Sequence, residues 1–561
     1  MRLMPLTSVL FAAATLSACG KPESTPSTGQ PAAPTAVTEA VIQAAAASNV
    51  PAAQGIAWRP ALTDADVDAS FALARSQNKP VFVYWGAAWC PPCNQLKATL
   101  FNRQDFIART QSFVAVYIDG DSPGAQKLGA RFKVRGYPTT VLFTAEGVEL
   151  TRLPGEVDAA RYTQLLTFGM TAQRPVKAVL ALALNPATAA QLSADDWKLL
   201  AFYSWETDEQ QIAPTAQWPD LLKRLADVAR PTGSEAATRL LLKSIAAGSV
   251  VSGSTADKSV SNQPRPQPQQ LERVRKLLAN STAARAQMDV LTNSAADLVR
   301  GLSASKTSER GALVDAFHAA LKTLEADSTL SRADRLTALS ARMELAKIDA
   351  PKDTDASVSE ALQTEVRAHV AQADREITNG HERQAVITSA ADVLEQAGLL
   401  TESTALLESN LAKSHTPYYL MSGLASNAKK RGDTAAALRW SELAFNKSEG
   451  PATRLQWGAS HIKTLVELAP QDEARIEQTA QQIFAEAAAQ PDAFFERSAR
   501  SLQRVGAQLR TWNKDRQHAA AVQRLQTQMT EICSRLPAND PQRAACDAVF
   551  KPPTAARGKA A

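Results

Sequence analysis

Trp89-Cys90-Pro91-Pro92-Cys93 decides the fold of the first part of this chain because of the sequence on either side of it. The run before it, Val81-Phe82-Val83-Tyr84-Trp85, is β-branched and aromatic and predicts a buried strand. The run after it, residues 94–101, predicts a helix. Cys90 therefore stands where a strand passes into a helix, and the positive end of the helix dipole favours a thiolate there. This position makes the cysteine pair a candidate redox centre.

Residues 56–172 alternate strand and helix signals around this motif. Helices are predicted at 64–78, 90–101, 126–132 and 158–168, and strands at 81–85, 113–118, 139–144 and 148–150. Such alternation predicts an α/β unit with a mixed sheet.

A second motif, Val134-Arg135-Gly136-Tyr137-Pro138-Thr139, comes just before the third of these strands. Together the two motifs resemble the thioredoxin superfamily, over roughly a fifth of the chain. The resemblance implies a cis bond before Pro138, the Tyr137 backbone beside the cysteine pair, and thiol–disulfide exchange as the activity. It implies no cofactor.

Roles follow residue by residue from the resemblance. Cys90, first in the motif and nearer to solvent, is the expected nucleophile, and Cys93 is the expected resolving thiol. Trp89 shields one side of the pair, and Tyr137 and Pro138 contact the substrate.

Pro91 and Pro92 are expected to tune the redox potential. Neither has a backbone N–H, so two donors that could stabilise the Cys90 thiolate are missing, while the two rings stiffen the loop. These effects oppose each other, and the direction of electron flow stays open.

Tyr84 departs from the family pattern. Many thioredoxins carry a buried aspartate six residues before the first cysteine, and the family uses that acid to deprotonate the second cysteine. Here the position is Tyr84, and no histidine lies within residues 56–172, so no imidazole is expected to act as the base instead. The resemblance therefore leaves open how efficiently Cys93 resolves a mixed disulfide.

A Cys-x-x-Cys motif also occurs in zinc sites and in structural disulfides. A zinc site requires four ligands, and no second pair at suitable spacing accompanies Cys90 and Cys93, so no metal is expected. A purely structural disulfide between the two cysteines is the remaining alternative.

Residues 1–19 predict a targeting segment. Arg2 precedes a largely apolar run at 6–16, and Leu16-Ser17-Ala18-Cys19 follows it. This pattern resembles the bacterial lipobox, which implies lipidation of Cys19, a membrane anchor and a location facing the periplasm. By the same resemblance, Gly20 after the cysteine favours a location at the outer membrane. An ordinary signal peptide with a chance cysteine and a transmembrane helix are the alternatives.

The remaining cysteines, Cys533 and Cys546, complete an even number if Cys19 is lipidated. Exported proteins in oxidising compartments pair their cysteines. We expect a structural disulfide that pins the terminal hairpin, and a redox relay with the first pair is the alternative.

The rest of the chain divides by composition. Residues 20–55 are rich in Pro, Ser and Thr and predict a flexible tether. Residues 175–380 predict a helical domain with a Pro-rich exposed loop near 250–270, and residues 384–550 predict helical repeats.

The repeats rest on a 34-residue period. Gly398 and Gly432 are 34 residues apart, as are Pro417 and Pro451. A turn glycine and a closing proline at this period resemble the tetratricopeptide repeat. A generic array of helical hairpins is the alternative, and in either case each hairpin buries its apolar face on its neighbours.

The expected function is that of a membrane-anchored thiol–disulfide oxidoreductase acting on protein disulfides in the cell envelope. Reduction is favoured because Lys79-Pro80-Val81 resembles reducing periplasmic domains, and this implies a membrane thiol electron donor. The repeats are expected to bind a partner or substrate. The net charge of +5 is dispersed, so no nucleic acid is expected. An envelope scaffold and a disulfide isomerase or chaperone are the alternatives.

Overall fold

The computed structural model describes residues 55–208, 210–232, 234–254, 267–351 and 358–552. The predicted leader with Cys19, nearly all of the predicted tether and most of the predicted Pro-rich loop lie outside the described residues. Among the described helices, none has both the length and the apolar character needed to span a membrane.

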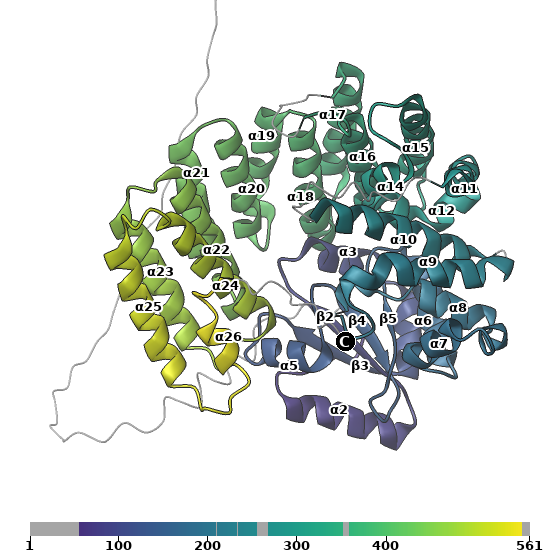
Figure 1. The fold of residues 1–561 in the computed structure, drawn as a ribbon, viewed down its shortest axis with the longest axis horizontal. Helices are drawn as coiled ribbons and strands as arrows, with labels where there is room; N and C mark the ends of the chain where they lie inside the picture. Colours follow the sequence, from purple (N-terminus) through teal and green to yellow (C-terminus); the bar gives the residue numbers. More distant parts are fainter. Residues whose placement is uncertain (1–54, 209, 233, 255–266, 352–357, 553–561) are drawn as a thin grey trace, which may run out of the picture. The chain divides into compact units, whose positions relative to one another are not determined.

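A five-stranded mixed sheet forms the first part of the fold (Figure 1), in the order β1-β3-β2-β4-β5. Its strands are β1 (Arg59–Pro60), β2 (Val81–Gly86), β3 (Val114–Asp119), β4 (Thr139–Phe143) and β5 (Glu149–Leu153). The strands β1, β3 and β2 are parallel, whereas β4 and β5 are antiparallel to their neighbours. The sheet confirms the predicted α/β unit, and β1 is an addition that its two residues could not signal.

Helices cover both faces of the sheet. They are α2 (Asp64–Gln77), α3 (Pro91–Thr99), α4 (Gln104–Arg109), α5 (Ala125–Phe132) and α6 (Ala159–Thr171). Side chains of α2 and α5 share a core with alternate residues of β2 such as Val83 and Trp85. The other residues of β2, Phe82 and Tyr84, pack with α3, α4 and α6. Each face of the central strand is thus buried, as its continuous apolar sequence predicts.

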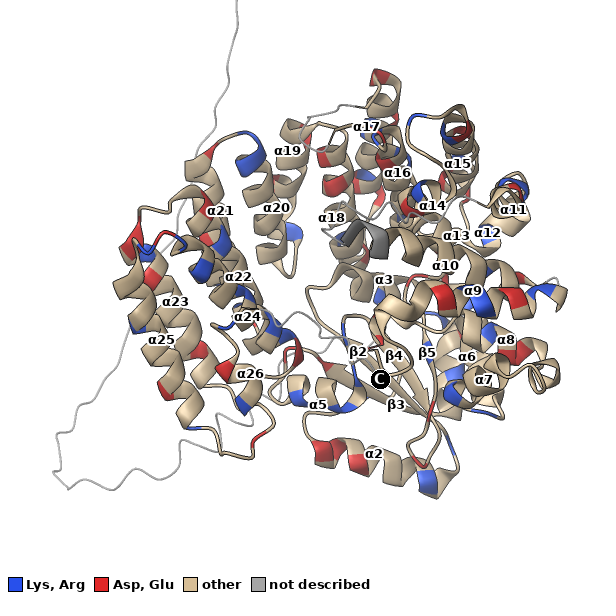
Figure 2. Cartoon of the chain, viewed as in Figure 1, with Lys and Arg blue, Asp and Glu red and all other residues tan. Residues whose placement is uncertain are grey.

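The described chain from residue 176 onwards is helical. Its α-helices are α7 (Val176–Leu184), α8 (Ala194–Ala201), α9 (Trp218–Ala229), α10 (Glu235–Ser254), α11 (Pro268–Leu278), α12 (Ser281–Ala286), α13 (Met288–Asn293), α14 (Ala295–Leu302), α15 (Ser308–Ala326), α16 (Arg332–Ala346), α17 (Glu360–Glu376), α18 (Gly380–Gln396), α19 (Leu400–Asn410), α20 (Pro417–Lys430), α21 (Thr434–Lys447), α22 (Pro451–Leu468), α23 (Glu473–Ala488), α24 (Glu496–Trp512), α25 (Ala519–Ser534) and α26 (Arg543–Asp547). This confirms the predicted all-α region. Basic and acidic residues are interspersed along these helices (Figure 2).

The 34-residue period has a counterpart in the helical hairpins. Gly398 and Gly432 follow α18 and α20 with φ of 82° and 75°, a left-handed conformation that glycine adopts without strain. Pro417 and Pro451 are the first residues of α20 and α22, where the missing N–H costs nothing. The tetratricopeptide assignment itself stays a prediction.

The helical region packs onto the sheet domain at two places. Helix α18 contacts α3, and α24 contacts α5. The hydrophobic core around Phe82 and Tyr84 also continues without interruption into helices as far as Leu345. The cysteine motif at the start of α3 therefore lies between the sheet domain and helices from far along the chain (Figure 1).

Candidate active site

Cys90 is the N-cap residue of α3. Pro91 and Pro92 occupy the first two helical positions, so neither can donate to the cap. The first available amide is that of Cys93, which donates to Cys90 Sγ at 3.4 Å. The sequence therefore builds one sulfur–amide contact into the motif itself.

The second motif lies directly beside the first. The Tyr137–Pro138 peptide bond is cis, as the resemblance implied. Thr139 begins β4 and pairs with Trp85 of β2, which fixes this loop beside the motif that follows β2. Cys90 Sγ lies 3.6 Å from the carbonyl oxygen of Tyr137 and donates to it. The expected arrangement of Cys90, Tyr137 and Pro138 is thus present.

Both cysteines of the motif are free thiols and both are buried. Cys90 is 3% exposed and Cys93 is fully buried. The expected order of exposure is present, but Cys90 is not at the surface. Burial raises the pKa of the Cys90 thiol well above its ordinary value, and the shared hydrogen bond with Cys93 raises it further. This direction is opposite to the one expected from the helix terminus, and its chief cause is the burial of the sulfur.

Cys93 behaves differently. Burial raises the pKa of its thiol, but the Cys90 thiol and the Ala87 backbone donate to its sulfur, and the net direction is below the ordinary value. Of the two sulfurs, Cys93 is therefore the one whose thiolate form the surrounding hydrogen bonds favour.

Helices from the second half of the chain cover Cys90. The Tyr419 ring stacks on Trp89 with centroids 5.9 Å apart, and the Arg497 guanidinium lies 5.1 Å from the Trp89 ring and 5.2 Å from the Tyr137 ring. Between these groups and Cys90 lies a cavity of about 290 Å³. One wall of the site thus comes from residues more than 300 positions away in the sequence.

Asp121 connects the two walls. Its carboxylate accepts hydrogen bonds from Trp89 Nε1 at 2.9 Å and from Thr453 Oγ1 at 2.7 Å, and it pairs with Arg497 at 2.5 Å. Nearby, Asp492 accepts the Gln126 amide at 2.9 Å. These contacts were not predicted, since no local pattern relates Asp121 to a helix more than 300 residues further on.

Two imidazoles also reach the motif from the helical region. His381 Nδ1 lies 2.7 Å from Asn94 Oδ1, and His415 Nε2 lies 3.2 Å from the Ala88 carbonyl. Asn94 in turn donates to the Cys90 carbonyl at 2.9 Å. Both histidines lie outside residues 56–172, and within the described residues their recorded partners are Asn94 and Ala88, so the expectation that no imidazole acts as the base stays a prediction.

Cys533 and Cys546 are joined by a disulfide between α25 and α26, with 5.7 Å between their Cα atoms. Both are buried in the apolar cluster of α22–α25. This is the pairing expected from the sequence.

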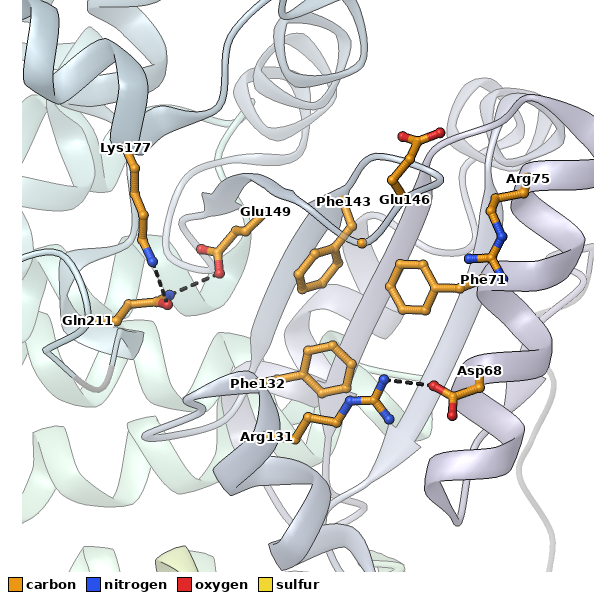
Figure 3. Close-up of a pocket in the computed structure, with 11 residues that line it drawn as sticks. Asp68, Phe71, Arg75, Arg131, Phe132, Phe143, Glu146, Glu149, Lys177 and Gln211 are labelled. Atoms are coloured by element: carbon orange, nitrogen blue, oxygen red, sulfur yellow. Dashed lines mark hydrogen bonds and ion pairs between the residues drawn. The ribbon is translucent and has the colours of Figure 1, made fainter.

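A second cleft of the molecule lies apart from the cysteine pair. A cleft of about 540 Å³ lies beside α2 and α5 (Figure 3), where Phe71, Phe132 and Phe143 meet a charged rim that includes Arg131. No cysteine lines it. Within the described residues, no group of three or more His, Cys, Asp or Glu side chains is placed to hold a metal ion.

Comparison with curated proteins finds relatives of the cysteine-containing domain. Three relatives match part of the chain. Thiol:disulfide interchange protein DsbD 1 of Pseudomonas aeruginosa is 30% identical over 120 residues, 21% of this chain and 20% of the relative. DsbD 2 of the same organism is 29% identical over 102 residues, 18% and 17% of the two chains. DsbD of Ralstonia nicotianae is 27% identical over 108 residues, which are 19% of this chain and 18% of the relative. The chain thus spans at most a fifth of the length of these relatives.

Comparison with solved structures finds a thioredoxin from Thermus thermophilus, 26% identical over 20% of this chain and 85% of that one, with a TM-score of 0.18. It also finds DsbH Oxidoreductase, 20% identical over 24% and 99% of the two chains, with a TM-score of 0.19. The profile of the thioredoxin-like domain matches residues 67–169. This segment of the chain is a thioredoxin-like domain, and a largely helical region follows it.

Proposed function

We propose that this protein is a thiol–disulfide oxidoreductase whose exchanging pair is Cys90 and Cys93. The observation that carries the proposal is the juxtaposition of two free thiols at the start of α3 with the Tyr137 carbonyl, 3.6 Å from Cys90 Sγ. The thioredoxin-like match and the thiol:disulfide interchange relatives support it.

The exchange proceeds through two sulfur transfers. Cys90, as the thiolate, attacks one sulfur of a substrate disulfide, forms a mixed disulfide and releases the first substrate sulfur, which takes a proton. Cys93 then loses its proton and attacks Cys90 Sγ. This step releases the second substrate sulfur and leaves a Cys90–Cys93 disulfide. Two electrons have moved from the protein to the substrate, and an external dithiol must return them.

Protein disulfides in the cell envelope are the proposed substrates, and reduction is the proposed direction. The lipobox-like sequence ending at Cys19 supports a lipid anchor and a position facing the periplasm, with a lean towards the outer membrane. A membrane thiol donor is the proposed source of electrons.

The helical region is proposed to control which substrates reach Cys90. In the described arrangement Cys90 is 3% exposed, and a folded protein cannot place a disulfide against it. A cavity of about 290 Å³ admits only a small or extended segment. Larger substrates require the helices that carry Tyr419 and Arg497 to move away from Cys90. A partner bound to the repeats could supply the energy for this movement.

The same burial supports a second candidate. The contacts of Asp121 with Thr453 and Arg497 tie the domain to the helices as a docking contact would. An envelope scaffold with a weakly active thioredoxin-like module would be built this way.

Reduction of insulin disulfides by the full-length protein, with dithiothreitol as donor, separates the two candidates. The oxidoreductase predicts turnover that Cys90→Ser removes and that the Cys533→Ser/Cys546→Ser variant retains. Turnover no faster than dithiothreitol alone, with or without Cys90, both for insulin and for the small glutathione disulfide, would favour the scaffold.

A further inference from the structure

The cavity beside Cys90 has more basic than acidic residues in its lining. Its aromatic rings include those of Trp89, Tyr137 and Tyr419. The charged residues of the lining are three arginines and one glutamate, namely Arg135, Arg497, Arg500 and Glu496. A molecule that reaches the Cys90 sulfur through this cavity therefore meets flat rings and guanidinium groups.

Helix α24 supplies a row of arginines to this side of the site. Arg497, Arg500 and Arg504 are three and four residues apart, so they share one face of the helix. Arg504 lies outside the cavity lining and donates to the Ser501 hydroxyl at 2.9 Å. Burial, chiefly, and the positive charges of Arg500 and Arg497 lower the pKa of Arg504. The row as a whole adds to the positive potential at the cavity.

Carboxylates balance only part of this charge. Arg497 pairs with Asp121 at 2.5 Å, and Arg500 pairs with Glu496 at 2.9 Å. The Arg135 side chain is exposed and makes no hydrogen bond or ion pair with any described residue. Arg500 also donates to the Arg135 backbone carbonyl at 3.1 Å, which brings the two residues together. A guanidinium without such a partner and one whose side chain is 41% exposed thus belong to adjacent residues of the lining.

We propose that this cavity binds a carboxylate of the substrate through Arg135 and Arg500 while Cys90 attacks the neighbouring disulfide sulfur. The inference deepens the proposed function and rests on it. The favoured substrates are disulfides, either small or within an extended segment, in which a carboxylate lies a few bonds from the sulfur. Disulfides with an amino group in that place are disfavoured, because the arginines repel it.

Guanidinium groups suit this role because their N–H donors match the two oxygens of a carboxylate and stay charged throughout the physiological pH range. Arg497 is held in its ion pair and keeps the wall in place, whereas Arg135 and Arg500 have donors left for a ligand. The rings of Trp89 and Tyr419 offer apolar surface to the methylene groups between the carboxylate and the sulfur.

Alkylation of Cys90 by iodoacetate and by iodoacetamide tests the proposal in the full-length Cys93→Ala protein. The two reagents are similar in size, and each forms a sulfur–carbon bond as iodide leaves, but only iodoacetate carries a carboxylate. The ratio of their rates is independent of the thiolate fraction of Cys90, since both react with the same thiolate. We expect Arg135→Gln/Arg500→Gln to lower the ratio of the iodoacetate rate to the iodoacetamide rate about tenfold. Sodium chloride at about 1 M should lower it in the parent protein.

Arg510→Gln is the matched control. Arg510 lies on the same helix, but it donates to the Val549 carbonyl and is not part of the cavity lining, so the ratio should stay within about twofold. Arg135→Gln alone breaks no hydrogen bond or ion pair between described residues, and it covers the case in which the double variant does not fold. It should lower the ratio about threefold. Arg135→Lys/Arg500→Lys keeps both charges and should retain most of the preference for iodoacetate.

Disulfide exchange with the wild-type protein separates the two sources of the carboxylate. The small pair is 3,3′-dithiodipropionate and 2-hydroxyethyl disulfide, and the peptide pair has Asp or Lys next to a disulfide-bonded cysteine. Preference for the acidic member in both pairs assigns the cavity to small disulfides and to extended segments alike. Preference in one pair only assigns it to that source. In each case Arg135→Gln/Arg500→Gln should reduce the preference about tenfold.

The proposal is overturned if the arginine substitutions and salt leave the alkylation ratio unchanged, or if neither disulfide pair shows a preference for the acidic member. The alkylation needs a reactive Cys90 but no disulfide exchange. If the wild-type protein exchanges no disulfide, the proposed function fails, while the alkylation ratio still decides whether the cavity selects carboxylates.

Discussion

Two cysteine pairs of this chain are buried to a similar degree and yet differ in almost every other respect. Cys90 and Cys93 are free thiols at a strand-to-helix junction, with an amide, a carbonyl and a cavity beside the first sulfur. Cys533 and Cys546 are joined across α25 and α26 within a cluster of aliphatic and aromatic side chains.

The comparison shows that burial alone does not separate a reactive pair from a structural one. The polar groups around the sulfurs and a space for a second molecule make the difference. The first pair has both, and the second is enclosed by its apolar cluster.

The largest expected difference between the two cysteine pairs is in their contribution to disulfide exchange. Cys90→Ser should reduce insulin turnover to the background rate because, among the described residues, Cys90 supplies the only sulfur that lines the cavity. The measurement is the initial rate of insulin reduction at equal protein concentration. Full activity in Cys90→Ser would place the reactive sulfur elsewhere and erase the distinction between the pairs.

The next largest expected effect is the pH dependence of alkylation at Cys90. Burial raises the pKa of Cys90, so only a small thiolate fraction exists at neutral pH. Iodoacetamide labelling of Cys90 should therefore rise about tenfold per pH unit from neutral pH to beyond the ordinary thiol range. Peptide mass spectrometry follows Cys90 separately, and a rate that levels off below pH 8 would show that its thiolate is not destabilised.

The covering helices should have a smaller effect. Thr453→Val removes the hydroxyl that lies 2.7 Å from both carboxylate oxygens of Asp121, and it weakens the contact that holds the helices over Cys90, although the backbone amide of residue 453 still donates to Asp121. A loss of roughly 1.4 kcal/mol in this contact raises the open population, and with it the labelling rate of Cys90, about tenfold.

Thr464→Val is the control for this change. Thr464 lies on the same helix, α22, but donates only to the Ser460 carbonyl. Equal labelling rates in both variants would mean that Asp121 does not control access to Cys90.

The second pair should have the smallest effect on exchange and a large effect on stability. Cys533→Ser/Cys546→Ser should leave insulin turnover within about twofold, since neither residue lines the cavity. Opening a loop of 13 residues should lower the free energy of unfolding by about 3 kcal/mol. Denaturant unfolding measures the second quantity. A loss of turnover without a loss of stability would instead support a relay between the pairs.

Sequence patterns predicted the parts of the site that local physics determines. The strand at Val81–Trp85 and the helix after Cys90 follow from runs of fewer than ten residues, whereas the loop ending at Pro138 was expected from the resemblance to the thioredoxin superfamily. The helix α4 was missed because its six residues carry little periodicity.

The wall of the site that Tyr419 and Arg497 form could not be predicted from local sequence patterns. Tyr419 and Arg497 reach Trp89 only because successive hairpins carry them there, and no spacing in the sequence encodes such a contact. The raised pKa of Cys90 follows from the same burial, which explains why the helix terminus alone predicted the wrong direction.

A single redox titration tests the central claim most directly. The full-length protein is equilibrated in dithiothreitol and glutathione buffers of graded potential, and differential alkylation with mass spectrometry reports both cysteine pairs in each sample. The account predicts that Cys90–Cys93 converts between dithiol and disulfide within about −120 to −270 mV, the range of thioredoxin-like exchange proteins. It predicts that Cys533–Cys546 stays oxidised to below about −300 mV, as structural disulfides do. A Cys90–Cys93 pair that stays in one state throughout, or two pairs that titrate together, would contradict it.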